Sequence, residues 1–275
     1  MKKIIVPVDF STTAANAAEF AGNLAIFYGG EILLYNAYQM PVPVGEISYP
    51  LYDVPEMQQA SEHELEMLKS DLEAKLRSKI TINIKAEMTM LSDGLADLCD
   101  SIKPDLVVIG LSGKNALTKL IVGSNTIHIA HHLKYPVLVV PPKASFTPVR
   151  KIGFACDYKE ISESLPVEVL KKIITDFNAE LYVINVDFQD KNFTPEVVHE
   201  NFAIRYLFED IHPKFESIES ENVTEGLNSF AENNGIDWLV VIPKKHTILQ
   251  KIFNRSHSTD LLFHTHLPVL CLHHQ

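Results

Sequence analysis

Cysteine is scarce in this sequence, and the few cysteines are far apart. Only three occur in 275 residues, at Cys99, Cys156 and Cys271, and no two of them form a CxxC pair. A sparse and odd number of cysteines argues against a disulfide framework and is typical of a reducing compartment. The composition therefore predicts a cytoplasmic protein.

Long apolar runs are lacking as well. None approaches the roughly 20 residues that a membrane-spanning helix needs. At the N-terminus, Met1-Lys2-Lys3 is basic, but the apolar run from Ile4 to Val8 stops at Asp9, before the apolar core of a signal peptide could form. We therefore expect neither a membrane partner nor a secretory leader.

Basic residues are outnumbered by acidic ones. The chain has 24 Lys and Arg against 35 Asp and Glu, which gives a formal net charge of −11. Nucleic-acid binding depends on clustered positive charge, so this balance argues against a nucleic-acid partner. The hydrophobic fraction of 46% is that of a globular protein, and the length suits one large domain or two ordinary ones.

The sequence does contain an internal repeat. Its two halves open alike, with Lys3–Asp9 and Lys151–Asp157, which are both apolar runs that end in an aspartate. Near their ends, Pro104–Ile109 matches Ile236–Val241, and the same offset carries Pro136–Val140 onto Pro268–Leu272. Prolines mark a short linker from Pro142 to Arg150. We therefore predict two homologous domains, at residues 1–142 and 150–275.

Strand and helix patterns alternate along each half. The expected strands of the first half are Ile4–Val8, Glu31–Ala37, Thr81–Met88, Leu106–Ile109 and Val137–Val140. Between them we expect helices at Ala14–Phe27, Glu56–Ser78, Gly94–Ile102 and Ser124–Leu133, the first capped by Ser11, Thr12 or Thr13 and ended by Gly29-Gly30. The second half shows a helix at Ser164–Asn178 and a strand at Glu180–Val186, but Asp187–Glu221 has no clear pattern. Such alternation predicts an α/β fold, with helices on both faces of a parallel sheet.

Two glycine-containing segments follow the fourth strand of the first half. Gly110-Leu111-Ser112-Gly113 comes directly after it, and Gly123-Ser124-Asn125 opens the next helix. Glycine lets the backbone approach an anion closely, and a helix N-terminus offers unpaired N–H groups. Asp9, at the end of the first strand, is suited to accept from an amino or hydroxyl group of a nucleoside. Spacing alone favours a phosphate loop no more than ordinary turns, because neither GxxxxGK[ST] nor GxGxxG is present.

These motifs together resemble the universal stress protein family. The resemblance rests on Ile-Ile-Val-Pro-Val-Asp at residues 4–9, the glycine pattern Gly110, Gly113, Gly123, Ser124, and Pro-Val-Leu-Val-Val-Pro at residues 136–141. It covers the whole first half and, more loosely, the second. It implies a doubly wound, adenine-nucleotide alpha-hydrolase-like fold, with five parallel strands in the order 3-2-1-4-5 in each domain. Tandem members form an internal pseudo-dimer and often dimerise again, so the resemblance also implies a homo-oligomer.

The same resemblance implies a bound ATP or another adenine nucleotide, with Mg²⁺ as an optional companion. Asp9 would contact the adenine, and the backbone around Asn36-Ala37 would close the base pocket. The glycines, Ser124 and Asn125 would hold the ribose and phosphates. The residues implied in binding are Pro7, Val8, Asp9, Asn36, Ala37, Gly110, Gly113, Gly123, Ser124 and Asn125.

The second half departs from this glycine pattern. The positions of Gly110, Gly113 and Gly123 are taken there by Ile242, Lys245 and Arg255, and only Ser124 is retained, as Ser256. Bulky side chains do not suit a loop that must lie against a phosphate. We therefore predict one nucleotide site per chain, with the second half as a degenerate partner that contributes an interface.

Histidines and cysteines offer further candidate sites. His128 and His132 are spaced i, i+4 on one predicted helix that also carries His131, and His264, His266, His273 and His274 lie near the end of the sequence. No HExxH glutamate or adjacent cysteine accompanies them, so we expect surface or interface histidines and no metal site. Cys156 and Trp238 are expected in the core.

The function predicted from these observations is that of an ATP-binding regulator or sensor in a stress response. No evident base accompanies the glycine loop, so we expect no catalysis beyond slow hydrolysis. Two alternatives stay open. One is an adenylating enzyme of the same fold, although Asp9–Thr13 lacks the glycines of its usual pyrophosphate loop; the other is a nucleotide-free scaffold paired through its last strands. The apolar loop around Tyr49, Leu51 and Tyr52 is either a lid or an interface.

Overall fold

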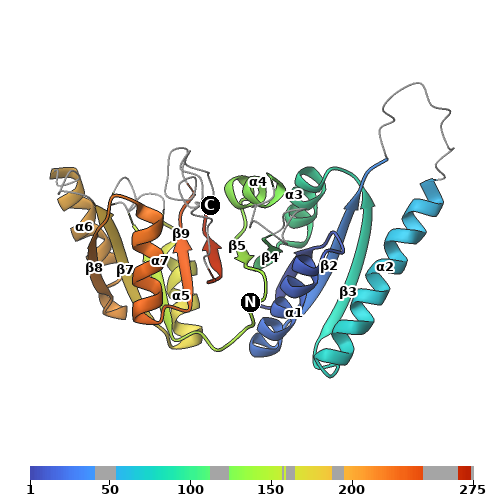
Figure 1. The fold of residues 1–275 in the computed structure, drawn as a ribbon, viewed down its shortest axis with the longest axis horizontal. Coiled ribbons are helices and arrows are strands. Elements are labelled where there is room, and N and C mark those ends of the chain that lie inside the picture. Colours follow the sequence, from blue (N-terminus) through green and yellow to red (C-terminus); the bar gives the residue numbers. More distant parts are fainter. Residues whose placement is uncertain are drawn as a thin grey trace. The chain divides into compact units, whose positions relative to one another are not determined.

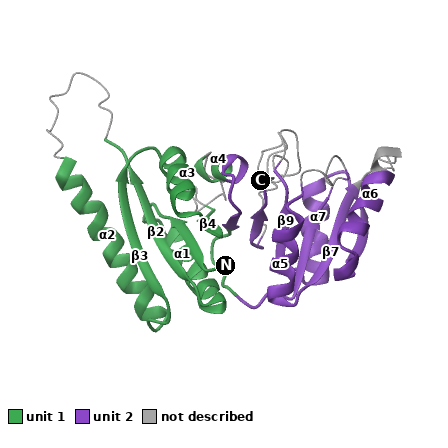
Figure 2. Cartoon of the chain, turned by 180° about the vertical axis from the view of Figure 1, so that it is seen from behind, with its two compact units in different colours: residues 1–112, 123–129, 140–146 green, residues 113–122, 130–139, 147–275 purple. Residues whose placement is uncertain are grey.

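The structure is a computed structural model that describes residues 1–40, 54–111, 124–156, 158, 165–187, 195–243 and 266–273 (Figure 1). The chain packs as two compact units (Figure 2). Unit 1 comprises residues 1–112, 123–129 and 140–146, and unit 2 comprises residues 113–122, 130–139 and 147–275. Unit 2 therefore takes in a segment from the first half of the sequence. The predicted domain boundaries, 1–142 and 150–275, stay a prediction.

The first half alternates strands and helices as predicted. Its elements are β1 (Lys3–Pro7), α1 (Thr12–Tyr28), β2 (Glu31–Tyr38), α2 (Val54–Lys75), β3 (Thr81–Met88), α3 (Leu91–Ile102), β4 (Leu106–Gly110), α4 (Ser124–His132) and β5 (Val137–Val140). Within unit 1 the strands lie in the order β3-β2-β1-β4, with parallel pairing of β1 to β2, β1 to β4 and β2 to β3. Beyond β4, the backbone N–H of Leu111 donates to the carbonyl of Val140 at 3.0 Å, which joins the end of β5 to this sheet.

The second half repeats this order. Its elements are β6 (Lys151–Ala155), α5 (Val167–Phe177), β7 (Glu180–Asp187), α6 (Pro195–Leu207), the 3₁₀ helix η1 (Glu209–Ile211), β8 (Lys214–Glu219), α7 (Val223–Asn234), β9 (Trp238–Val241) and β10 (Val269–Cys271). The strands β8-β7-β6-β9-β10 are all parallel to their neighbours, and Val137–Val139 of β5 pair with β10 in antiparallel fashion. The predicted α/β fold and the strand order 3-2-1-4-5 are thus confirmed.

Helix α1 begins and ends where its sequence indicates. The hydroxyl of Ser11 accepts from the N–H of Ala14 at 3.2 Å, so Ser11 is the N-cap among the three candidates. At the other end Gly29 adopts a left-handed conformation, with φ 61°, and its N–H donates to helix carbonyls. Asn16 donates to the carbonyls of Pro141 and Ala144, so the predicted linker is tied to α1 at its start.

In each half, an aspartate just before the fourth strand makes the same pair of hydrogen bonds. Asp105 accepts from the backbone N–H groups of Lys2 and Lys3 at 2.7 and 3.0 Å. Asp237, its partner in the sequence repeat, accepts from the N–H groups of Arg150 and Lys151 at 2.7 and 2.9 Å. Each aspartate therefore fixes the start of the first strand of its half to the start of the fourth.

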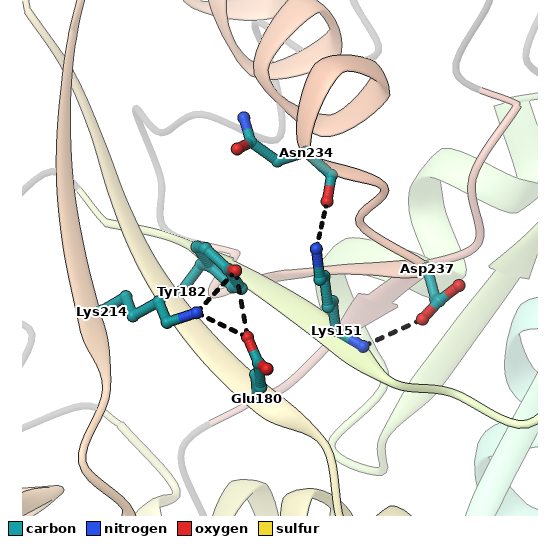
Figure 3. Close-up of polar contacts among 6 residues, drawn as sticks. All are labelled: Lys151, Glu180, Tyr182, Lys214, Asn234 and Asp237. Carbon is teal, nitrogen blue, oxygen red and sulfur yellow. Dashed lines mark hydrogen bonds and ion pairs between the residues drawn. The ribbon is translucent and has the colours of Figure 1, made fainter.

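The second half adds side-chain contacts at this amino end, as Figure 3 shows. Lys214 donates to Glu180 at 2.7 Å and to the hydroxyl of Tyr182 at 3.0 Å, and Lys151 donates to the carbonyl of Asn234 at 2.7 Å. In the first half the matching contact is weaker, since Asn83 lies 3.4 Å from Glu31. These contacts lie at the strand end opposite to the one where α/β proteins bind ligands.

The segment Asp187–Glu221, which showed no clear pattern, contains α6, η1 and β8. On α6, Ile204 and Phe208 beyond it are buried, whereas Phe202 and Tyr206 are exposed. Apolar residues on two faces of one helix weaken the helical period, which explains why the pattern was not legible. The other predicted elements differ from the structure only at their ends; the helix predicted at Glu56–Ser78, for example, runs from Val54 to Lys75.

Trp238 lies in the core, as predicted, with its ring 5.4 Å from that of Phe177. All three cysteines are buried and none of them is in a disulfide, and Cys156 packs as the small apolar residue that was expected. Across the described residues, no helix combines the length and apolar character needed to cross a membrane.

Candidate functional site

The strand β2 extends beyond the carboxyl end of β1. The last paired residues are Pro7 and Tyr35, and the N–H of Val8 then donates to the carbonyl of Tyr35 at 2.8 Å. Along a parallel strand, alternate residues direct their backbone groups to opposite neighbours. Ala37, two residues after Tyr35, therefore directs its N–H and carbonyl to the side of β1, past the point where β1 has ended. This gives a backbone donor and acceptor at the edge of the candidate base pocket.

The side chain of Asn36 bridges the same region. Its Nδ2 donates to the carbonyl of Val8 at 2.7 Å, and its Oδ1 accepts from the hydroxyl of Ser61 on α2 at 2.7 Å. Both bonds are buried, so each end of the Asn36 amide has a partner within the protein. Ser61 was missed at the sequence level, although it is a polar residue within the apolar stripe of α2, four positions before Leu65.

Asp9 is exposed and lies two residues after β1. Its Oδ1 accepts from both the N–H and the hydroxyl of Ser11, at 3.1 and 2.5 Å. Between them Phe10 has a positive φ of 60°, which turns the chain into α1. No donor among the described residues lies on Oδ2 of Asp9, so this oxygen can accept from a ligand.

Gly110 ends β4 on the other side of β1. A Cβ at this position would lie 2.7 Å from the carbonyl oxygen of Thr13, so only glycine lets the first turn of α1 approach β4 this closely. The carbonyl of Gly110 also accepts from the buried hydroxyl of Thr126 at 3.2 Å, which anchors α4 to the end of β4. Within the described residues, the requirement for glycine at 110 is thus explained by helix packing.

Helix α4 begins at Ser124, and Asn125 in its first turn is exposed. The first N–H groups of an α-helix have no partner within the helix and carry the positive end of its dipole. At α1, by contrast, Ser11 already caps the N-terminus. The predicted residues Gly113 and Gly123 lie outside the described residues.

The structure thus brings five of the predicted residues together, namely Pro7, Val8, Asp9, Asn36 and Ala37, and Gly110 lies on the neighbouring strand. Because β1 pairs with β2 on one side and β4 on the other, the order of the strands reverses at β1. Ligands of open α/β sheets bind beyond the carboxyl ends of the strands at such a switch point.

Among the described residues, the histidines and cysteines form no comparable site. No group of three potential metal ligands occurs among the residues that the structure describes, and His264 and His274 lie outside them. His273 contacts the carbonyl of Ala130 at 3.0 Å, and burial holds the pKa of its ring below the ordinary value. Burial likewise raises the pKa of Cys99 to about 12, which disfavours a reactive thiolate.

The second half retains the same strand-end framework. The N–H of Cys156 donates to the carbonyl of Ile184 at 2.9 Å, and Asn185 donates to the carbonyl of Cys156 at 2.8 Å. Tyr158 follows with a positive φ of 51°, as Phe10 does in the first half. Tyr158 is only 6% exposed, however, whereas Phe10 is 38% exposed. The predicted counterparts Lys245, Arg255 and Ser256 lie outside the described residues.

Comparison with known proteins gives a consistent result. A universal stress protein of Methanocaldococcus jannaschii is 26% identical over 144 residues, which cover 50% of this chain and 81% of that protein. A universal stress protein of Archaeoglobus fulgidus has a similar structure over 98% of each chain, with a TM-score of 0.70 and 13% identity. A Pseudomonas aeruginosa protein of unknown function is similar over 99% of this chain and 92% of its own, with a TM-score of 0.55 and 15% identity.

The two solved structures show that the fold extends over the whole chain. At the level of sequence, residues 1–141 match the model of the universal stress protein family. That match spans half of the chain and includes every residue of the candidate site. The chain therefore belongs to the universal stress protein family.

Proposed function

We propose that the first half of the chain binds ATP or another adenine nucleotide at the carboxyl ends of β1, β2 and β4. The observation that carries this proposal is the overhang of β2 beyond β1, with Asp9 beside it. Together they offer one backbone donor, one backbone acceptor and a carboxylate oxygen at the switch point of the sheet. This set matches the amino group and ring nitrogens at the edge of an adenine.

In the proposed complex the base lies at this overhang, and the phosphates extend toward the start of α4. The backbone of Ala37 and the Oδ2 of Asp9 hold the adenine. The unpaired N–H groups of α4, with the glycines 113 and 123, hold the phosphates. Support for this direction comes from Thr126, which ties the first turn of α4 to Gly110.

In this proposal Mg²⁺ is bound only together with the phosphates of the nucleotide. Among the described residues that end β1, β2 and β4, Asp9 is the only carboxylate, and it is assigned to the base. Mg²⁺ bound to a nucleotide keeps several waters and needs few protein ligands, so this arrangement accommodates it. The described residues place no general base beside the start of α4, and we propose nucleotide binding, not turnover, as the basis of a regulatory or sensor role in a stress response.

Isothermal titration of the full chain with ATP tests the proposal. We expect one site per chain, and we expect Gly123→Arg to abolish binding, because it introduces the side chain that Arg255 has in the second half. Arg255→Gly is the matched control and leaves affinity and stoichiometry unchanged. The absence of heat with the wild type, or an unchanged affinity in Gly123→Arg, would overturn the proposal. Mass spectrometry of ligand that co-purifies with the chain then identifies the nucleotide.

A nucleotide-free scaffold is the second candidate, and a specific pairing favours it. β5 and β10 pair in antiparallel fashion, with Val137 opposite Cys271 and Val139 opposite Val269. This pairing occupies the last strand of each half and requires no ligand. Under this hypothesis the titration with ATP gives no heat, while light scattering of the ligand-free chain gives a defined homo-oligomer.

A further inference from the structure

Ser61 is a buried hydroxyl in an otherwise apolar stripe of α2. It is 6% exposed, and Leu65 and Leu72 on the same helix are also buried, as is Leu76 directly after it. A hydroxyl that leaves water without a partner is destabilising, so a serine at such a position needs a hydrogen bond. Its partner is Oδ1 of Asn36, at 2.7 Å.

The donors and acceptors of this chain of bonds are fixed by chemistry. The amide oxygen of Asn36 can only accept, so the hydroxyl of Ser61 donates to it. The opposite end of the amide can only donate, and it faces the carbonyl of Val8 at 2.7 Å. A turn of the amide by 180° would place acceptor against acceptor at Val8, so the carbonyl of Val8 fixes which way the amide faces. The hydroxyl of Ser61 then donates to Oδ1 and holds the amide from its other end.

The second half shows what this arrangement looks like without the serine. Asn185 makes the same bond to the carbonyl of Cys156, at 2.8 Å, but it is only partly buried. No donor to Oδ1 of Asn185 occurs among the described residues. The bond between the second and first strands is thus common to both halves, whereas among the described residues the second support of the amide occurs only in the half that carries the glycine motif.

We propose that Ser61 is a positioning residue for the base end of the nucleotide site, an inference that rests on the proposed function. Both Nδ2 and Oδ1 of Asn36 are buried and bond within the protein, so we assign Asn36 an indirect role toward the base. It acts through the carbonyl of Val8, which holds the chain immediately before Asp9, and through β2, where Ala37 follows. Ser61 therefore sets the spacing between the carboxylate and the backbone groups that select adenine.

Titration of the full chain with ATP and with GTP tests this role. In Ser61→Ala the buried Oδ1 of Asn36 loses its donor, and we expect the Kd for ATP to rise about tenfold. The Kd for GTP changes less, because guanine has a carbonyl in place of the 6-amino group that Asp9 accepts from in adenine, so the preference for ATP falls. Ser61→Thr keeps the hydroxyl and retains the preference. Ser70→Ala is the matched control, since the exposed hydroxyl of Ser70 bonds only to Glu66 of its own helix.

The outcomes separate the two proposals. If the wild type does not bind ATP, the proposed function fails. If it binds and Ser61→Ala keeps the same ratio of ATP to GTP affinity, Ser61 is only structural and the inference is overturned. Should Ser61→Ala not fold, Asn36→Asp provides the same test, because a carboxylate cannot donate to the carbonyl of Val8; an unchanged ratio there also overturns the inference.

Discussion

The two halves of this chain share a framework and differ in the groups that the framework supports. Asp105 and Asp237 make the same two backbone contacts at the amino ends of the strands. Asn36 and Asn185 make the same side-chain bond at the carboxyl ends. These bonds position one strand against the next, so we expect them in any sequence that adopts this fold.

The differences lie where a ligand would bind. Gly110 lets the first turn of α1 lie against β4, whereas Ile242 takes the matching position in the second half and is buried. Phe10 is largely accessible after β1, whereas Tyr158 is buried after β6. The comparison shows that the same strand-to-strand hydrogen bonds occur in both halves, while the residues at and just after the ends of the first and fourth strands differ.

The largest effect is expected when Gly110 is replaced by isoleucine, the residue that the second half has at the matching position, Ile242. In Gly110→Ile a Cβ would lie 2.7 Å from the carbonyl oxygen of Thr13, so α1 must move. We expect the free energy of unfolding to fall by about 2–3 kcal/mol and ATP binding to be lost. Urea denaturation followed by circular dichroism measures the first effect, and titration measures the second. Ile242→Val, which removes one methylene in the second half, is the control and leaves ATP binding intact.

A Gly110→Ile protein that is stable and still binds ATP would contradict this comparison of the two halves. It would show that the close approach of α1 to β4 is not needed for the site, and that the loss of glycine in the second half does not explain the loss of a ligand there.

A smaller effect is expected from the two aspartates at the amino ends, and it should be equal in both halves. Asp105→Ala and Asp237→Ala each leave two backbone N–H groups without their acceptor. We expect each to lower the free energy of unfolding by about 1 kcal/mol, because water replaces the acceptor in part at these accessible positions. Asp105→Asn, which keeps one acceptor oxygen, should recover part of the loss. Urea denaturation of the variants tests this, and a large difference between the halves would contradict the shared framework.

Much of the fold could be predicted because its signals are local. Apolar runs such as Leu106–Ile109 and Val137–Val140 indicate strands buried on both faces, and Ser11 and Gly29 mark the ends of α1. The repeat also showed that Asp105 and Asp237 correspond, although it could not show why. Their role depends on the start of another strand, more than 80 residues away in each case.

The candidate site was predictable only in part, for the same reason. Asp9 lies two residues after β1 and Gly110 ends β4, so their place at one edge of the sheet follows from parallel pairing. Ser61 contacts Asn36 across 25 residues of sequence, and nothing local indicates that partner. Glycine at 110 was interpreted as a close approach to phosphate, whereas within the described residues its neighbour is the backbone of Thr13. Long-range packing of this kind leaves no periodic signal in a sequence.

The smallest effect is a pH dependence that arises from His273, near the end of the second half. At the end of the fifth strand the first half has Pro141, and the second half has His273, which bonds to the carbonyl of Ala130 at 3.0 Å. Burial lowers the pKa of His273 from its ordinary value of 6.5, whereas backbone carbonyls of Ala130, Tyr135 and His131 oppose this shift in part. The ring is therefore neutral in the folded protein at a pH where the unfolded chain already takes up a proton.

The sign of the effect follows from this difference in proton binding. The folded protein is most stable above about pH 6.5, and stability is lost as the pH falls through the lowered pKa of His273, because the unfolded state binds the additional proton first. His273→Gln keeps a donor for the carbonyl of Ala130 and has no ring to protonate, so its stability should fall less between pH 8 and pH 5. Urea midpoints at the two pH values measure the difference, with the exposed His63→Gln as control. If His273→Gln and the wild type lose the same stability on acidification, the buried ring does not distinguish the ends of the two halves.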